Sequence, residues 1–439
     1  MILDAEFLHS MAERLPDETP RPALRRAPVS VLYGGAHLFR ADCIEKLGGM
    51  ARAAFDAHAA TALDLDTLLD LGLRSAKLRD RVHALVRTKL ATAPIADLRI
   101  DFEDGYGERP DAEEDAHAVQ AAERLAQAIE KGIAPPLAGI RPKALTRARA
   151  ARSLRTLELF LQTLVARAGA IPAGFVVTLP KVSQVDQAEA LASVLGKLER
   201  GLGLPEGAVA CELMVETKAM LLAEDGTIGL SAFAQRLGPR LSGMHLGTYD
   251  LLSQLGVMAK DQDARHPAAD LARLWMQFAL SGTGVSLSDG ATTVLPLPVH
   301  KTGSVPLDIA QVTENNRAVR AALALHATNI RSALRLGITQ GWDLHPAQLL
   351  ARYAVVFAYF LGHLDEAARR LRNFVDAASH ATSVGTTFDD AATAHGLLQF
   401  FRQGHAAGAF SDADLSGTSL TLEEILRGDF AGIVRSRRG

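Results

Sequence analysis

The feature that most constrains the fold is an alternation of short apolar runs with long amphipathic segments along most of the chain. The short runs often contain β-branched residues, which is typical of buried strands. The long segments repeat apolar residues every three or four positions, which indicates helices. Strands that alternate with helices build a parallel sheet, and eight strands are the number of a TIM (β/α)8 barrel. The expected strands are 29–33, 98–102, 138–141, 175–179, 211–215, 243–246, 285–288 and 341–344.

Two helix-rich segments exceed what such a barrel needs. Residues 51–92 are helical in pattern and make the first crossover much longer than usual. Helical sequence also continues well past the last expected strand. We therefore expect a TIM barrel catalytic domain over residues 1–350 with a helical insertion at about 51–96, followed by a helical carboxyl-terminal extension or lid over 351–439.

Charge and cysteine content limit the classes of partner. The 47 Lys and Arg residues nearly balance the 50 Asp and Glu residues, so the chain has no overall attraction to nucleic acid or to an anionic membrane. Cys43 and Cys211 are too few for a disulfide framework or a cysteine-rich metal site. The first residues lack the pattern of a secretory signal, and no apolar run approaches the roughly 20 residues of a membrane span. We expect a cytoplasmic protein without a nucleic-acid or membrane partner.

Charged residues follow almost every expected strand. In a parallel barrel the residues just past the carboxyl ends of the strands converge on one rim, where such enzymes carry out their chemistry. Any single acid at such a position can also serve only to cap the next helix. The polar residues at these strand ends are Glu103, Asp104, Arg141, Lys181, Glu216, Asp250, Asp289 and His345.

Two of these carboxylates follow neighbouring strands and can share a cation. Glu216 and Asp250 supply hard oxygen ligands, and Mg²⁺ needs only one or two protein carboxylates because it keeps waters that substrate oxygens replace. Zinc is less suited, since no Cys and no spaced His pair accompanies them. A guanidinium on the same rim, Arg141, can clamp a carboxylate or stabilise an enolate oxygen, although a strand-end Arg most often pairs with a nearby acid.

His345 and Lys181 each allow two interpretations. His345 can act as a general base, but a His at a strand end is more often a structural hydrogen-bond partner. Lys181 can form a Schiff base, but a salt bridge to the rim acids is favoured.

Seven short motifs occur in an order that is more specific than any one of them. Together they span roughly residues 29–348, most of the chain. With these motifs the chain resembles the citrate lyase beta-subunit-like and malyl-CoA lyase group of the HpcH/HpaI aldolase superfamily. The motifs are VLYGGAHLFR, IDFEDG, GIRPKALT, TLPKV, LMVET, HLGTYDLLSQLG and GWDLHPAQ.

The resemblance implies a Mg²⁺-dependent TIM barrel, with Mn²⁺ as the alternative ion, that makes or breaks carbon–carbon bonds in acyl-CoA or 2-oxo acid substrates. It implies a homo-trimer or hexamer. Carried over by position, Glu216 and Asp250 correspond to the metal ligands, and Arg141 corresponds to the arginine that steadies the substrate oxygens. Glu103 and Asp104 correspond to outer carboxylates that bind metal-coordinated water.

A lid segment completes the resemblance. The family places a carboxylate from a carboxyl-terminal lid in a neighbouring subunit's site, and SVGTTFDDAATAHGLL is similar to that lid, which implies Asp389 or Asp390, with Asp390 preferred.

Some motif positions depart from the family and leave the substrate class open. Pro142 and Lys143 replace the Asn that follows the Arg in the family, and the lysine that usually follows the glycine before the last motif is missing. Two other functions therefore stay open beside a carbon–carbon lyase acting on a small substrate such as a CoA thioester. One is a CoA-independent class II pyruvate-type aldolase, and the other is a non-catalytic acyl-CoA-binding protein on the same barrel.

Overall fold

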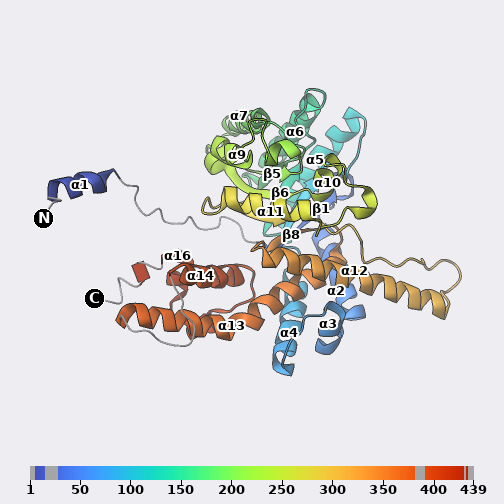
Figure 1. The fold of residues 1–439 in the computed structure, drawn as a ribbon. Helices are drawn as coiled ribbons and strands as arrows, with labels where there is room; N and C mark the ends of the chain where they lie inside the picture. Colours follow the sequence, from blue (N-terminus) through green and yellow to red (C-terminus); the bar gives the residue numbers. More distant parts are fainter. Residues whose placement is uncertain (1–4, 15–27, 381–390, 430–431, 434–439) are drawn as a thin grey trace.

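The computed structural model describes residues 5–14, 28–380, 391–429 and 432–433. Within them, eight parallel strands form a closed barrel in chain order, and β1 closes it by pairing with both β2 and β8 (Figure 1). The predicted TIM barrel is confirmed, and each expected strand lies within two residues of an observed one. The strands are β1 (Ser30–Gly35), β2 (Asp97–Asp101), β3 (Leu137–Arg141), β4 (Val176–Leu179), β5 (Ala210–Val215), β6 (Leu241–Leu246), β7 (Ser286–Asp289) and β8 (Gln340–Asp343).

Amphipathic helices cover the outside of the barrel. In α6 (Ala150–Ala168), Leu157, Phe160, Leu161 and Leu164 are all buried, and this spacing of three and four residues puts them on one face toward the sheet. The predicted alternation of strands with helices is confirmed. The other helices that follow strands are α5 (Asp111–Glu130), α7 (Val185–Gly201), α8 (Lys218–Leu221), α9 (Leu230–Leu237), α10 (Thr248–Gln254), α11 (Pro267–Leu280) and α12 (Ile309–Arg335).

The insertion and the carboxyl-terminal extension form one helical layer beside the barrel (Figure 1). Helix α13 (Leu349–His380) packs along α4, where the Tyr353 hydroxyl donates to the Pro94 carbonyl oxygen over 2.8 Å. Capping fixes the inserted helices, since the Thr61 and Ser75 hydroxyls accept from backbone amides at the starts of α3 and α4. The layer comprises α2 (Cys43–His58), α3 (Ala62–Leu69), α4 (Ala76–Thr92), α13, α14 (Ala391–Ala406), α15 (Asp412–Leu415) and α16 (Leu422–Arg427).

The remaining short elements lie at chain ends and connections. They are α1 (Ala5–Glu13) and the 3-10 turns η1 (Ala36–Leu38), η2 (Gly238–Arg240), η3 (Ala259–Asp261), η4 (Pro346–Gln348) and η5 (Ser416–Thr418).

Helix α13 corrects one expectation from the sequence. Residues Pro346–Asp376 are long and apolar enough to cross a membrane, so an apolar run of that length does exist. However, 83% of the most apolar window is buried inside the protein. The apolar composition of α13 is therefore explained by its contacts with the other helices.

The barrel interior contains ionic groups that the apolar strand pattern concealed. Arg99 on β2 donates to Glu212 Oε2 on β5 over 2.7 Å, and its guanidinium also pairs with Asp97. His245 Nε2 on β6 lies 3.3 Å from Glu212 Oε2, and its Nδ1 lies 3.2 Å from the Tyr33 hydroxyl. Because each charge has a buried partner, the interior holds a paired polar layer beneath the rim.

Candidate active site

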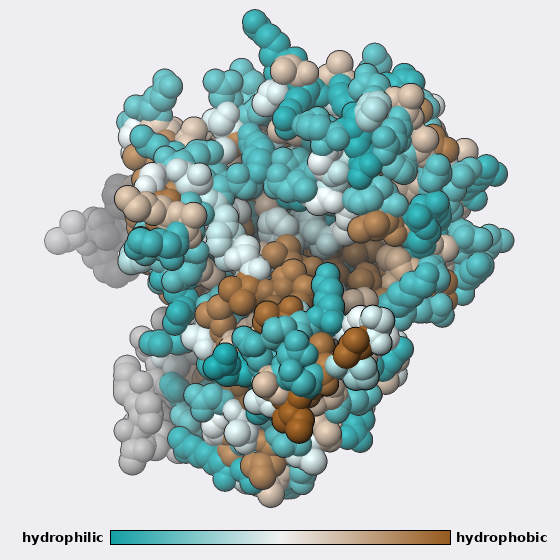
Figure 2. Space-filling model, turned by 90° about the vertical axis from the view of Figure 1, so that its right-hand side faces the viewer, coloured by the Kyte–Doolittle hydropathy of each residue, from teal (hydrophilic) through white to brown (hydrophobic). Residues whose placement is uncertain are grey.

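The predicted site residues gather at the carboxyl ends of the strands. Glu103 and Asp104 lie in the loop after β2, Lys181 follows β4, Glu216 follows β5, and Asp250 lies on α10 after β6. Helix α10 and the β7–α12 connection lie on the right of Figure 1, and Figure 2 views the molecule from that side. This face is hollowed near its centre, with hydrophobic residues below the hollow.

A single ammonium group contacts all four carboxylates. Lys181 Nζ lies 2.8 Å from Asp250 Oδ2 and 3.4 Å from Asp104 Oδ2. It lies 3.9 Å from both Glu216 Oε2 and Glu103 Oε1. The carboxyl groups of residues 216 and 250 thus face the same cation from the segments that follow the adjacent strands β5 and β6. The favoured sequence interpretation of Lys181, a salt bridge to the rim acids, is what the structure contains.

The backbone of Lys181 takes a rare conformation at this point. Its φ is +53°, in the left-handed region that non-glycine residues seldom occupy. In this conformation the Lys181 amide donates a hydrogen bond to Glu216 Oε1. Such a conformation costs about 1–3 kcal/mol and persists only where surrounding contacts hold it in place. Residues with this kind of backbone strain occur most often at functional sites.

A buried arginine faces the acids from β3. Arg141 donates from Nε and Nη2 to the two oxygens of Asp101, over 2.7 and 2.6 Å. Its guanidinium lies over the rings of Tyr33 and Trp342, with its central carbon 4.8 and 5.3 Å from their centroids. Among the described residues, Arg141 Nη1 has no hydrogen-bond partner and lies 3.7 Å from Glu103 Oε2. One hydrogen-bond donor of a fixed, buried guanidinium is therefore directed at the acidic cluster.

The floor under this arginine holds a second buried donor. Trp342 on β8 packs against Tyr33 on β1 with ring centroids 4.4 Å apart, and its Nε1 is buried without a hydrogen-bond partner among the described residues. Neither Tyr33 nor Trp342 was identified from the sequence. The pairing of β1 with β8 brings the two rings together. Their contact could be found only from the register of these two strands, which the sequence does not reveal.

Burial and charge shift the pKa values of these acids in different directions. Burial, reinforced by the Asp250 charge and opposed by Lys181, raises the pKa of Glu216 to about 7. Burial and a hydrogen bond with Asp104 raise the pKa of Glu103 to about 8. Burial opposes ionisation of Asp104, but the hydrogen bond with Glu103 and the Lys181 charge lower its pKa overall. Burial disfavours the Lys181 ammonium, but Glu216 and Asp250 raise its pKa above the ordinary value.

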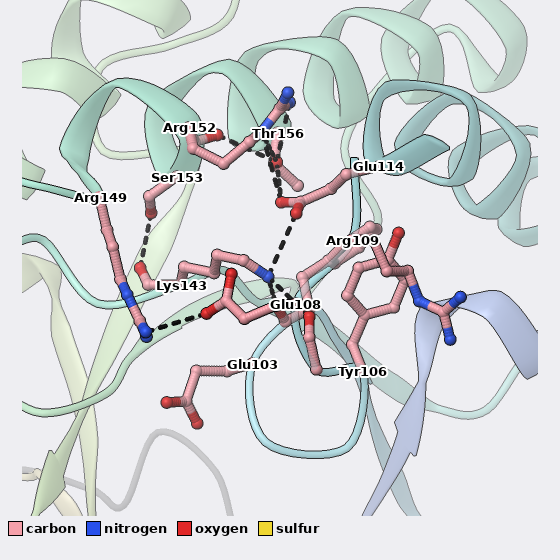
Figure 3. A network of polar contacts seen from close by, with 12 residues as sticks. Glu103, Tyr106, Glu108, Arg109, Glu114, Lys143, Arg149, Arg152, Ser153 and Thr156 are labelled. Carbon is pink, nitrogen blue, oxygen red and sulfur yellow. Dashed lines mark hydrogen bonds and ion pairs between the residues drawn. The ribbon is translucent and has the colours of Figure 1, made fainter. Parts of the chain in front are cut away.

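Lys143 fixes the loop that carries Glu103 and Asp104. Its ammonium is buried and donates to the carbonyl oxygens of Phe102 and Gly107, both over 3.0 Å, so it holds the two ends of that loop (Figure 3). It also lies 3.1 Å from Glu114 Oε2 on α5. Sequence reasoning noted Lys143 only as a departure from the family motif.

Glu114 completes this network on the helix side. It is fully buried, and its Oε1 accepts a hydrogen bond from the Thr156 hydroxyl on α6 over 2.6 Å (Figure 3). The loop is therefore joined through Lys143 and Glu114 to two covering helices.

Two glycines allow the backbone to pass close to polar side chains of the site. A Cβ on Gly247 would lie 2.5 Å from Glu216 Oε2, and one on Gly290 would lie 2.2 Å from the Thr248 hydroxyl oxygen. Both positions therefore exclude any side chain while Glu216 and Thr248 keep their places.

The other predicted residues have different surroundings. His345 precedes η4, and its Nδ1 accepts a hydrogen bond from the Ala347 amide, so its role as a base stays a prediction. Asp289 at the end of β7 accepts from Arg273 Nε on the covering helix α11 over 2.7 Å, so it forms a structural ion pair. Asp389 and Asp390 lie outside the described residues.

The donor set suits a hard divalent cation. The described residues contain no group of three or more His, Cys, Asp and Glu side chains that could hold a metal together. A pair of carboxylates is enough for Mg²⁺, because this ion keeps several of its waters when it binds. Glu216 and Asp250 fit that role, because they already face one cation.

Comparison with known proteins identifies a family but no activity. No curated protein is significantly similar in sequence. The solved structures that match include Haloferax volcanii malate synthase, at 15% identity and a TM-score of 0.49 over 96% of this chain and 99% of that one. They also include a citrate lyase beta subunit from M. tuberculosis, complexed with oxaloacetate and magnesium, at 18% identity and a TM-score of 0.39 over 76% and 98%. Because the sequence identities and TM-scores of these structures are low, they assign no role to any residue of this chain. A family model matches residues 8–431, and the chain belongs to that family, described as a domain of unknown function, DUF6986.

Proposed function

We propose that this protein is a Mg²⁺-dependent enzyme that cleaves or forms a carbon–carbon bond in an acyl-CoA thioester or in a 2-oxo or hydroxy acid. The observation that carries the proposal is the pair Glu216 and Asp250, which face a single cation while the free Nη1 of Arg141 points at the same cluster. The order of the seven sequence motifs supports the same chemistry.

Glu216 and Asp250 would hold the cation, and Glu103 and Asp104 would order its water. When bound, the cation would supply positive charge beside the substrate oxygen on which charge develops as the carbon–carbon bond breaks or forms. Mn²⁺ would serve in place of Mg²⁺, since both are hard ions that accept oxygen ligands.

Arg141 would donate from Nη1 to the substrate oxygens. Because Asp101 fixes the other side of its guanidinium, this donor needs little reorganisation during the reaction. The Tyr33 and Trp342 rings pack against the same guanidinium and support its position. The group that moves the proton is not assigned, and His345 and Asp390 remain its candidates.

The metal site is tested by binding and by turnover. Glu216→Gln and Asp250→Asn should each weaken Mn²⁺ binding in isothermal titration by at least about tenfold, because each removes one of two anionic ligands. Each variant should also lose metal-dependent activity on any substrate that the protein turns over. Near-normal binding and turnover in either variant would refute the ligand assignment.

The substrate class is tested by thermal shift in the presence of Mg²⁺. Stabilisation by acetyl-CoA or propionyl-CoA would favour the lyase acting on thioesters, and stabilisation only by free 2-oxo acids would favour a pyruvate-type aldolase. Tight acyl-CoA binding without turnover on a broad panel would favour a binding protein.

We also propose a cytoplasmic protein that forms a homo-trimer or hexamer. Sedimentation velocity of the full chain, in which a trimer has about 140 kDa from a subunit of 46.8 kDa, tests the assembly.

A further inference from the structure

We propose that the Lys181 ammonium is a built-in cation that neutralises the acidic cluster and that a divalent metal must displace. This inference rests on the proposed metal site at Glu216 and Asp250. It assigns Lys181 a role in setting how tightly and how selectively that site binds metal.

The first argument is geometric. Lys181 Nζ contacts the two carboxylates that would ligate the metal, at 2.8 Å from Asp250 and 3.9 Å from Glu216. It contacts the two outer carboxylates as well, at 3.4 and 3.9 Å. A metal that bound these oxygens would need the volume that the ammonium fills, so the two cations exclude each other.

The second argument concerns charge. Ionised carboxyl groups that converge on one point repel one another unless a cation lies among them. Arg141 Nη1 approaches Glu103 and Asp104, at 3.7 and 3.9 Å, while its other nitrogens pair with Asp101. Among the described residues, Lys181 is the cation whose ion pairs include Glu216 and Asp250.

The third argument is that the side chain can leave while its backbone stays. The Lys181 amide is anchored to Glu216 in the left-handed conformation, which fixes the Cα position. The side chain is 28% exposed, so its flexible four-carbon stem already reaches solvent. The ammonium can therefore move toward solvent without disturbing the ligand that its own amide holds.

If the metal displaces the Lys181 ammonium, this side chain has opposite effects on the metal-free protein and on metal binding. Without metal, Lys181 stabilises the folded site, and with metal it opposes binding. A monovalent ion gains too little from the carboxylates to displace an ammonium already attached to the chain, so the site should respond to divalent ions.

The test is Mn²⁺ titration of the full-length protein and of Lys181→Met, which keeps a chain of similar length without charge. We expect Lys181→Met to bind Mn²⁺ about tenfold more tightly than the natural protein, because the strength of a partly exposed ion pair lies between those of exposed and buried pairs. We also expect the metal-free form of Lys181→Met to melt at a lower temperature than the metal-free natural protein. Lys218→Met is the matched control, because it removes one positive charge from an exposed residue that follows the neighbouring strand β5. It should change the Mn²⁺ affinity by less than about twofold.

Amine labelling gives a second measurement that does not depend on activity. An acetylating reagent followed by peptide mass spectrometry should modify Lys181 slowly in metal-free protein and faster after Mg²⁺ is added. Lys260, an exposed residue paired with its neighbour Asp261, should react equally in both conditions.

The outcomes separate this inference from the proposed function. If neither the natural protein nor Lys181→Met binds Mn²⁺, the metal site itself fails. If the natural protein binds Mn²⁺ but Lys181→Met binds it equally or more weakly, or if Mg²⁺ leaves the labelling of Lys181 unchanged, the site stands and the exchange is refuted.

Discussion

The acids of residues 101–104 have different functions although they are close in sequence. Asp101 points into the barrel and holds Arg141, whereas Glu103 and Asp104 lie in the loop and face Lys181. The sequence placed Glu103 and Asp104 at the rim because strand ends converge there, whereas Asp101 fell inside the expected strand 98–102. It could not assign their partners, because these depend on which strands are neighbours and on the register between them.

Gly247 allows a prediction at the scale of one residue. Gly247→Ala should weaken Mn²⁺ binding by about tenfold or more, because the new methyl group would lie 2.4 Å from Glu216 Cβ and displace that ligand. Gly34→Ala is the control, since Gly34 lies on β1 with no atom within 4 Å of the added methyl group, and titration should find its affinity unchanged. Equal Mn²⁺ affinities in the two variants would contradict this account.

His326 links stability to pH. It is buried between Thr292 and Asp343, with Nε2 2.8 Å from Asp343 Oδ1. Burial lowers the pKa of His326 despite the charge of Asp343, while Arg352, which also pairs with Asp343, lowers it further. The pKa of Asp343 is itself held low, because Arg352 and His326 outweigh its burial, so it stays ionised near neutral pH.

The sign of the effect follows from the lowered pKa. Above the unfolded value of about 6.5 the His326 imidazole is neutral in both states, and below it the unfolded chain binds the proton first. The contribution of His326 to stability is therefore complete above about pH 6.5 and is lost as pH falls toward the folded pKa. Urea unfolding between pH 7 and 5 should show a steeper loss of stability for the natural protein than for His326→Gln. Parallel curves would rule out this linkage.

At the scale of elements, the strands and helices were predictable because each follows a local rule. Buried strands appear as short apolar runs, and α6 shows its buried face in the spacing of its own residues. The ionic groups inside the barrel were not predictable, since Arg99 and Glu212 become partners only when β2 and β5 face each other across the closed sheet. Lys143 was missed for the same reason, because its partner Glu114 lies on α5, the covering helix before β3.

The Lys143–Glu114 pair makes a prediction about the loop after β2. Lys143→Met should lower the free energy of unfolding by about 3 kcal/mol, because the buried charge of Glu114 would keep only Arg152, at 3.5 Å, as a cationic partner. The double variant Lys143→Met with Glu114→Gln should be more stable than Lys143→Met alone, since no buried charge is then left uncompensated. Urea denaturation of the four proteins of this cycle measures the coupling, and additive effects would show that the two residues act independently.

At the scale of the whole molecule, the helical extension is part of the same packed body as the insertion. Helix α13 packs against α2, α3, α4 and α12, so its apolar face is shared with segments from two distant parts of the sequence. The sequence predicted both helical segments but not that they cover each other. Whether the extension folds separately from residues 1–350 was not predictable either. An amphipathic pattern shows which face of a helix is buried, but it does not show which other helix covers that face.

This packing predicts that the barrel cannot be isolated by truncation. A chain that ends at Gln348 should be insoluble or lack a cooperative thermal transition, because the loss of α13 exposes buried residues such as Leu65, Val82 and Val86 to water. Supplying residues 349–439 as a second chain should restore solubility. A soluble 1–348 fragment with a sharp melting transition in circular dichroism would contradict the prediction.

The seam at which the barrel closes has a consequence for how the chain acquires its structure. Ser30 donates to Asp343 across 313 residues of sequence, where the first strand meets the last. During synthesis, β1 can pair with β2 early. The other edge of β1 pairs with β8, so it stays unpaired until nearly the whole barrel has left the ribosome. A nascent chain of this protein therefore carries an open strand edge for most of its translation, and an open edge of this kind is a template for pairing with other chains.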